Sequence, residues 1–187
     1  MNNNNEYILV LGSKPECRIP NLPFKYIYAA NGAIGRANEY KKKFSKFKLI
    51  SILSGKEFEK NLEVKKRVLN SSPDKIICRL GKIDLKKYNF SKKIDFQHLS
   101  NYQQLKIQSN FFNFGLINIF FFETFYENNF LKKIIHMFRS IGRGALVGTS
   151  TGFFAILCAL SDHPNKKIFI SGIGMIGGDH TTNDKDR

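Results

Sequence analysis

Short apolar runs that alternate with helix-like segments constrain the fold of this chain more than any other feature. The runs within residues 1–80 are Tyr7–Leu11, Tyr26–Ala29, Leu49–Leu53 and Lys75–Leu80. Such continuous apolar runs are typical of strands that are buried on both faces. Helices are expected between the later runs, over Arg36–Phe44 and Lys56–Leu69. The alternation predicts an α/β fold, with a Rossmann-like, doubly wound, mostly parallel sheet and helices on both of its faces.

A second informative stretch covers residues 144–180. A loop of small residues precedes an apolar segment there, and Ser150 or Thr151 is a suitable helix cap. The strand that follows is predicted at Lys167–Ser171, and Gly172 ends it. A helix that returns to such a strand begins beside the strand's carboxyl end. Ligands of open α/β sheets bind at that edge, where the free N–H groups of a helix start attract a phosphate.

The middle of the chain shows less periodicity. Residues 82–142 are expected to form an irregular, aromatic-rich insertion or a lid within a single domain that spans residues 1–187, and residues 1–6 a disordered tail. Seven residues between 122 and 141 share roughly one helical face: Phe122, Phe125, Tyr126, Phe130, Ile134, Phe138 and Ile141. A stripe of this kind usually packs in a core. The alternative is a lid or a surface that faces a membrane.

Charge and cysteine usage suggest partners and compartment. The formal net charge is +15, which suits an anionic partner or simply a solvated lysine-rich surface. The three cysteines have no metal-ligand spacing, so a reduced, cytoplasmic protein is expected. The residues after Met1 do not resemble a signal peptide, and the most apolar segment, 145–160, is shorter than the roughly 20 residues that span a bilayer.

Several well-known motifs are missing from the sequence. No GxxxxGK[ST] phosphate loop and no GxSxG nucleophile elbow occurs. Residues 172–177 match GxGxxG after a strand, but no second strand follows to carry the acid that binds a ribose. No group of His, Cys and acidic residues has the spacing of a zinc site, so no metal is expected.

What remains is a set of five loops that are predicted to meet at one sheet edge. They are residues 12–15, 30–32, 54–55, 149–152 and 172–174. Their small residues allow a ligand to approach the backbone, and their Ser, Thr and Asn side chains can bind a base, ribose or phosphate. Together these loops favour a nucleotide pocket.

The segments ILVLGSKP, YIYAANGA and TSTGFFAILCALSDHPNKKIFISGIGMI resemble the bacterial lipooligosaccharide sialyltransferases and the wider sialyltransferase-like glycosyltransferase family. The resemblance covers the two ends of the chain, about half its length. It implies a transferase that uses a CMP-activated sugar as donor substrate, with inversion and without a cofactor or required metal. The implied acceptor is a glycan or glycolipid in lipopolysaccharide biosynthesis. The basic surface would also suit peripheral contact with the anionic inner membrane.

The resemblance also assigns roles by position. Gly12 and Ser13 correspond to the first donor-contacting turn, and Asn31, with Gly32 beside it, to the asparagine that contacts CMP. Ser150, Thr151 and Gly152 correspond to a turn near the nucleotide, and Gly172 and Ile173 to the Gly-Ile after the strand. Two positions depart from the family: Ser13-Lys14 replaces Asn-Gly, and Gly174 stands where the family has Asp.

Inverting transfer needs a base for the acceptor hydroxyl, and a histidine suits that role near neutral pH. His180 is the candidate because it is the histidine that follows the last strand, although it comes earlier than the family's histidine. Alternatively, the chain is a fragment and the base lies beyond Arg187. Lys14 or Arg143 could offset charge on the leaving CMP.

Two other functions stay open. One is a non-catalytic nucleotide- or nucleic-acid-binding module, for which the charge and aromatic content fit in outline. Nucleic acid is the less favoured partner, because the lysines are scattered and most aromatic residues lie in apolar runs. The other is a transferase that uses a UDP- or GDP-sugar.

Overall fold

The computed structural model describes residues 6–14, 18–44, 46–111, 127–143 and 149–174, and within its helix 130–143 it describes side chains as far as residue 138. Contacts divide the chain into two compact units. One comprises Met1–His98 and Thr151–Arg187, and the other comprises Leu99–Ser150. The first unit contains the sheet.

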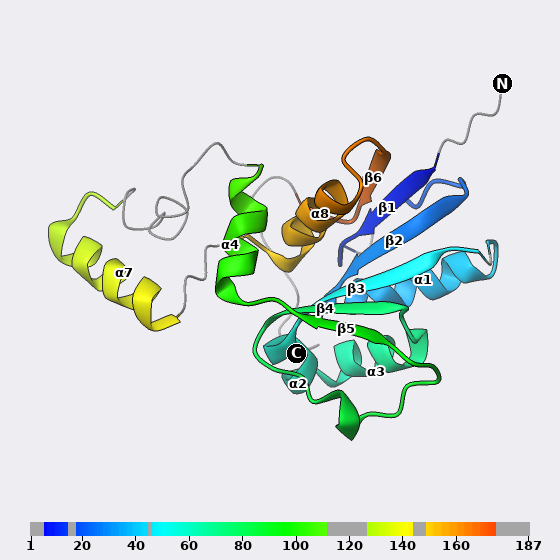
Figure 1. The fold of residues 1–187 in the computed structure, drawn as a ribbon, viewed down its shortest axis with the longest axis horizontal. Helices are drawn as coiled ribbons and strands as arrows, with labels where there is room; N and C mark the ends of the chain where they lie inside the picture. Colours follow the sequence, from blue (N-terminus) through cyan, green and yellow to red (C-terminus); the bar gives the residue numbers. More distant parts are fainter. Residues whose placement is uncertain (1–5, 15–17, 45, 112–126, 144–148, 175–187) are drawn as a thin grey trace. The chain divides into compact units, whose positions relative to one another are not determined.

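The sheet has six strands, and every pairing between them is parallel. The strands are β1 (Tyr7–Leu11), β2 (Phe24–Ala30), β3 (Lys48–Ser54), β4 (Lys75–Leu80), β5 (Asp95–His98) and β6 (Lys167–Ser171). Their order is β5-β4-β3-β2-β1-β6 (Figure 1). The chain therefore proceeds outward from β1 to β5 and returns to place β6 on the other side of β1. This arrangement confirms the predicted Rossmann-like α/β fold.

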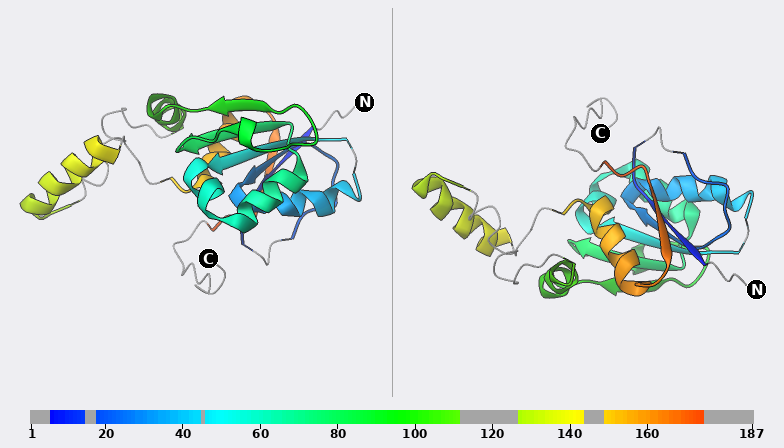
Figure 2. Two further views of the ribbon diagram at one scale, coloured as in Figure 1. Left: turned by 90° about the horizontal axis from the view of Figure 1, so that it is seen from below. Right: turned by 90° about the horizontal axis from the view of Figure 1, so that it is seen from above.

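Helices cover both faces of the sheet, as expected for a doubly wound fold. They are η1 (Asn31–Ala33), α1 (Ile34–Lys41), α2 (Gly55–Lys60), α3 (Leu62–Ser71), η2 (Leu85–Lys87) and α8 (Thr151–Asp162). Figure 2 shows α1 and α3 on one side of the strands and α8 on the other. Helix α8 packs on β1, β2, β3 and β6.

Side-chain alternation along the strands produces the two buried layers. Leu9 and Ile27 belong to a core that includes Ile34 of α1 and Val68 of α3. The neighbouring residues of each strand point to the opposite face. There the hydroxyl of Tyr28 donates to Asp162 of α8. Burial on both faces explains why these strands are continuous apolar runs.

The predicted helix over residues 56–69 is interrupted. The structure has α2 and α3 in its place, with Asn61 between them in an extended conformation (φ −101°, ψ 105°). The side chain of Asn61 accepts hydrogen bonds from the N–H groups of Glu63 and Val64 at 3.1 and 3.2 Å. Asparagine is a favoured N-cap, so this local bond starts a new helix where the apolar pattern suggests continuity.

The expectation of irregular structure over residues 82–142 is wrong at residues 95–98, where β5 pairs with β4. The pairing joins Lys75 to Asp95 and Cys78 to His98. The sequence DFQH has no apolar run because β5 is an edge strand, with half-buried Phe96 and Gln97 between exposed ends. Propensity alone does not identify a strand of this type.

The second unit contains α4 (Asn101–Ser109) and α7 (Phe130–Arg143). A capping box between Ser100 and Gln103 begins α4. In α7, Phe130 and Phe138 are 73% and 64% exposed, which contradicts the expectation that the aromatic stripe packs in a core. The side chains of Phe122, Phe125, Tyr126 and Ile141 lie outside the described residues, as does most of the predicted tail.

No helix in the described part of the chain is both long and apolar enough to cross a membrane.

Candidate functional site

The loops after β1 and β6 join at the carboxyl-terminal edge of the sheet. The N–H of Gly12 donates to the carbonyl of Ser171 at 2.8 Å, and the N–H of Lys14 donates to that of Gly172 at 3.0 Å. These two strands lie where the order of the sheet reverses, which is the usual position of a ligand in open α/β sheets. The structure thus brings two of the predicted loops together.

Glycine at position 12 is required by close backbone approach. A Cβ atom there would lie 2.2 Å from the carbonyl oxygen of Gly172 and 2.5 Å from Cγ1 of Ile173. Gly172 itself has a φ of 74°, in the region that favours glycine. Both glycines are explained by this junction, and their own N–H and C=O groups take part in it.

The start of α8 adds a third predicted loop to the junction. Helix α8 begins at Thr151, as the capping argument predicted, and Thr151 and Gly152 are half-buried. A Cβ on Gly152 would lie 3.5 Å from Cγ1 of Ile173. The Ile173 side chain therefore fills the space between Gly12 and the first turn of α8. A ligand at this junction would lie over this side chain, beside the first turn of α8, where the helix dipole favours negative charge.

Ser150 immediately precedes α8 and is exposed.

Asn31 links the ends of β2 and β3. Its φ of 45° is left-handed, a conformation that asparagine tolerates better than most residues. Its Oδ1 accepts a hydrogen bond from the N–H of Ser54 at 3.0 Å. Its Nδ2 makes no hydrogen bond within the described residues, and the side chain is half-buried. Asn31 is thus held in place by one end of its amide, and the other end can donate to a ligand.

Gly32 has a packing role in the structure. It is buried, and a Cβ there would lie 3.3 Å from Cγ2 of Val64 on α3. The contact of Gly32 with a nucleotide stays a prediction.

Ser13 and Lys14 are exposed at the same edge, and Arg36 joins them from α1. The Nη1 of Arg36 donates to the carbonyl of Lys14 at 2.8 Å. This places a second basic side chain beside the loop after β1. The sequence analysis did not identify Arg36. Its position five residues after Asn31, near the start of a helix that follows a strand end, could have indicated that it lies at this edge.

The remaining strand ends form a second junction along the edge. Ser54 caps α2 by accepting from the N–H of Glu57 at 3.4 Å. A Cβ on Gly55 would lie 2.6 Å from the carbonyl oxygen of Leu80. The Nε2 of His98 is 2.9 Å from the carbonyl oxygen of Gly81. His98 therefore lies at this edge and is exposed.

Arg79 is a further residue that the sequence analysis missed. It lies on β4 with 4% of its surface exposed, and its guanidinium carbon is 4.4 Å from the centre of the Phe154 ring of α8. Burial lowers the pKa of Arg79 to about 10, so the side chain is still protonated at neutral pH. On the same helix, burial raises the pKa of the Cys158 thiol to about 12, which makes this thiol unreactive.

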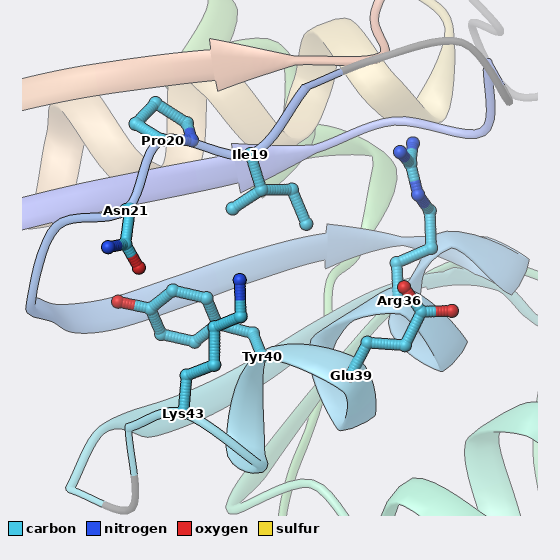
Figure 3. A pocket seen from close by; sticks show the side chains of 7 residues that line it. All are labelled: Ile19, Pro20, Asn21, Arg36, Glu39, Tyr40 and Lys43. Carbon is cyan, nitrogen blue, oxygen red and sulfur yellow. The ribbon is translucent and has the colours of Figure 1, made fainter.

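A cavity of about 230 Å³ lies between α1 and the connection from β1 to β2, and Arg36 belongs to its lining as well as to the edge described above (Figure 3). It is lined by Ile19, Pro20, Asn21, Arg36, Glu39, Tyr40 and Lys43. The hydroxyl of Tyr40, one of these lining residues, donates to the carbonyl of Leu22. None of the residues predicted to bind a nucleotide lines this cavity.

His180 lies outside the described residues, as do the side chain of Arg143 and Cys17, so their predicted roles stay predictions. Cys78 and Cys158 are buried free thiols. Within the described ranges, no cluster of His, Cys, Asp and Glu could hold a metal ion.

Comparison with known proteins gives no relative: no protein-family model, no curated protein and no solved structure matches the chain.

Proposed function

We propose that this protein is a sialyltransferase-like glycosyltransferase, which transfers a sugar from a CMP-activated donor to a glycan or glycolipid acceptor with inversion. One observation carries the proposal. The loops after β1 and β6 and the start of α8 meet where the order of the strands reverses, with the Asn31 amide at the same sheet edge. That edge is where open α/β sheets bind nucleotides.

The donor phosphate would lie against the first turn of α8. The N–H groups of that turn and the partial positive charge of the helix start suit an anion. The hydroxyl of Thr151 can donate to a phosphate oxygen, and the Nδ2 of Asn31 can donate to the cytosine or the ribose. The N–H of Gly12 is already bonded to Ser171 and that of Lys14 to Gly172, whereas the Ser13 hydroxyl is a donor that this loop can offer.

Lys14 and Arg36 would supply the charge for catalysis. In the transfer, the acceptor oxygen bonds to the anomeric carbon while the bond from that carbon to the CMP oxygen breaks. Negative charge develops on the departing phosphate, and nearby fixed cations stabilise it. The acceptor's proton goes to a general base, for which His180 remains the candidate.

Calorimetric titration tests the donor assignment. We expect CMP to bind with a dissociation constant below the millimolar range, and UDP and GDP to bind more weakly. Preferential binding of UDP or GDP would instead favour a transferase with a different sugar nucleotide. Absence of CMP binding at millimolar concentration would remove the assignment.

Donor hydrolysis then separates an enzyme from a binding module. Wild-type protein that releases CMP from a CMP-sugar is an enzyme, and loss of release in His180→Ala identifies the base. Binding without turnover favours the non-catalytic alternative. For the nucleic-acid alternative, filter binding of single-stranded DNA at two salt concentrations is decisive, because phosphate contacts make such binding steeply salt-dependent.

A further inference from the structure

Helix α7 has a broad apolar face. Successive residues of an α-helix are rotated by about 100°, which places the apolar side chains of α7 in one continuous arc of about 160°. The arc consists of Phe130, Leu131, Ile134, Ile135, Met137 and Phe138. It is much wider than the two-in-seven stripe of a coiled-coil seam.

This apolar face is exposed. Phe130, Leu131 and Phe138 are 73%, 69% and 64% exposed, and Ile135 is 47% exposed. Soluble proteins rarely leave so many large apolar side chains together in water unless the surface binds a partner. We therefore expect the apolar face of α7 to bind another surface.

The opposite face of α7 is basic. It carries Lys132 and Lys133, both exposed, together with His136, whose Nε2 is 3.8 Å from the carboxylate of Glu127. The helix sequence FLKKIIHMFRSIGR contains no acidic residue. The formal net charge of the whole chain is +15. The charge of the helix and of the chain thus complements an anionic surface.

We propose that α7 binds an anionic phospholipid bilayer and lies in its interfacial plane, with Phe130, Leu131 and Phe138 inserted among the acyl chains. A wide apolar arc opposite a lysine-rich face is the arrangement of interfacial helices. With 14 residues, α7 is too short to span a bilayer, which takes about 20. A second copy of the chain is a poorer occupant, because it would bring together two surfaces of strong like charge.

The proposal uses only α7 and needs no nucleotide, so it is independent of the proposed donor chemistry. If CMP fails to bind, the membrane contact is unaffected. If α7 fails to bind vesicles, the donor assignment is unaffected.

Vesicle sedimentation is the first test. The full chain is expected to sediment with vesicles of phosphatidylcholine and phosphatidylglycerol, to sediment weakly with phosphatidylcholine alone, and to be released by salt. Replacing Phe130 and Phe138 together by Ser should weaken binding by at least about tenfold, because their insertion is lost. Leu62→Ser is the matched control, since Leu62 is 67% exposed on α3.

The lysines are tested in the same way. Lys132→Gln with Lys133→Gln should weaken binding to the anionic vesicles by about tenfold to thirtyfold at low salt. The control replaces Lys86 and Lys87, an adjacent exposed pair in η2, and should leave binding unchanged.

A fluorescence reporter makes the test independent of the serine variants. The chain has no Trp, so Phe138→Trp introduces a single tryptophan, whose emission can be excited selectively at the red edge of the absorption band. We expect its emission to shift to the blue with anionic vesicles and to be quenched by brominated acyl chains, whereas Leu62→Trp should show neither effect. Unchanged Phe138→Trp emission, or binding that survives the double serine substitution, would overturn the proposal. Self-association that depends on Phe130 and Phe138 in the absence of vesicles would overturn it in favour of a second copy.

Discussion

Two glycine substitutions at the β1–β6 junction should have opposite effects on stability. In Gly12→Ala the new Cβ would lie 2.2 Å from the carbonyl oxygen of Gly172, and real Cβ contacts essentially never fall below 3.0 Å. The ends of β1 and β6 must therefore separate by nearly 1 Å. In Gly152→Ala the new Cβ would lie 3.5 Å from Ile173, which is ordinary contact.

The magnitudes follow from these distances. Overpacking of this kind costs about 1–3 kcal/mol, and the Gly12 to Ser171 hydrogen bond of 2.8 Å, which the shift would break, contributes about 1 kcal/mol more. Gly12→Ala should thus lower the free energy of unfolding by about 2–4 kcal/mol. Gly152→Ala should raise it by about 0.5–1 kcal/mol, because alanine is the better helix former.

Thermal unfolding, followed by far-ultraviolet circular dichroism, measures the change in stability of both variants. We expect the melting temperature of Gly12→Ala to fall by roughly 4–16 °C and that of Gly152→Ala to rise by a few degrees. Removing the Ile173 side chain should rescue Gly12→Ala only partly, because the clash with the Gly172 backbone persists. If Gly12→Ala is as stable as the wild type, the two loops do not meet as described.

Substitutions at three further positions test the surrounding structure. Asn61→Ala removes the cap of α3 and should cost about 1 kcal/mol in urea unfolding, whereas Asn61→Asp should be nearly neutral. Tyr28→Phe removes the 2.7 Å hydrogen bond to Asp162 and should cost about 1 kcal/mol; an unchanged midpoint would show that the bond contributes nothing. Burial lowers the pKa of His163, whose ring is 4.3 Å from that of Tyr26, below the ordinary 6.5. The unfolded chain therefore takes up the proton first, and stability should decline as the pH falls below about 6.5. His163→Phe should remove that decline, and an unchanged pH profile would contradict this reasoning.

The buried strands could be predicted from sequence because burial on both faces leaves a continuous apolar run. The predicted Tyr7–Leu11, Lys75–Leu80 and Lys167–Ser171 are the bounds of β1, β4 and β6. The strand that was missed, β5, lies at the sheet edge and lacks such a run. The interruption at Asn61 was also missed, because a single side-chain cap there outweighs an apolar pattern that continues past it.

For the candidate site, the sequence could predict a position at the sheet edge but not the contacts between its residues. Parallel strands put the loops after β1 and β6 at one edge, so the order of elements alone could place Gly12 and Gly172 at that edge, whereas their direct contact follows from the pairing of β1 with β6. The sequence could not show that Ile173 fills the gap, that the Gly12 N–H bonds to β6, or that Arg36 reaches the carbonyl of Lys14. Those details depend on side-chain packing between segments far apart in sequence.

Nuclear magnetic resonance of the ¹⁵N-labelled chain during titration with CMP tests the central claim most directly. We predict that the amide signals of Gly12, Ser13, Asn31 and Thr151 shift on saturation, while those around the cavity, such as Asn21, do not. Shifts centred on the cavity, or no shifts at millimolar CMP, would contradict the assignment of the donor site to the carboxyl-terminal edge of the sheet.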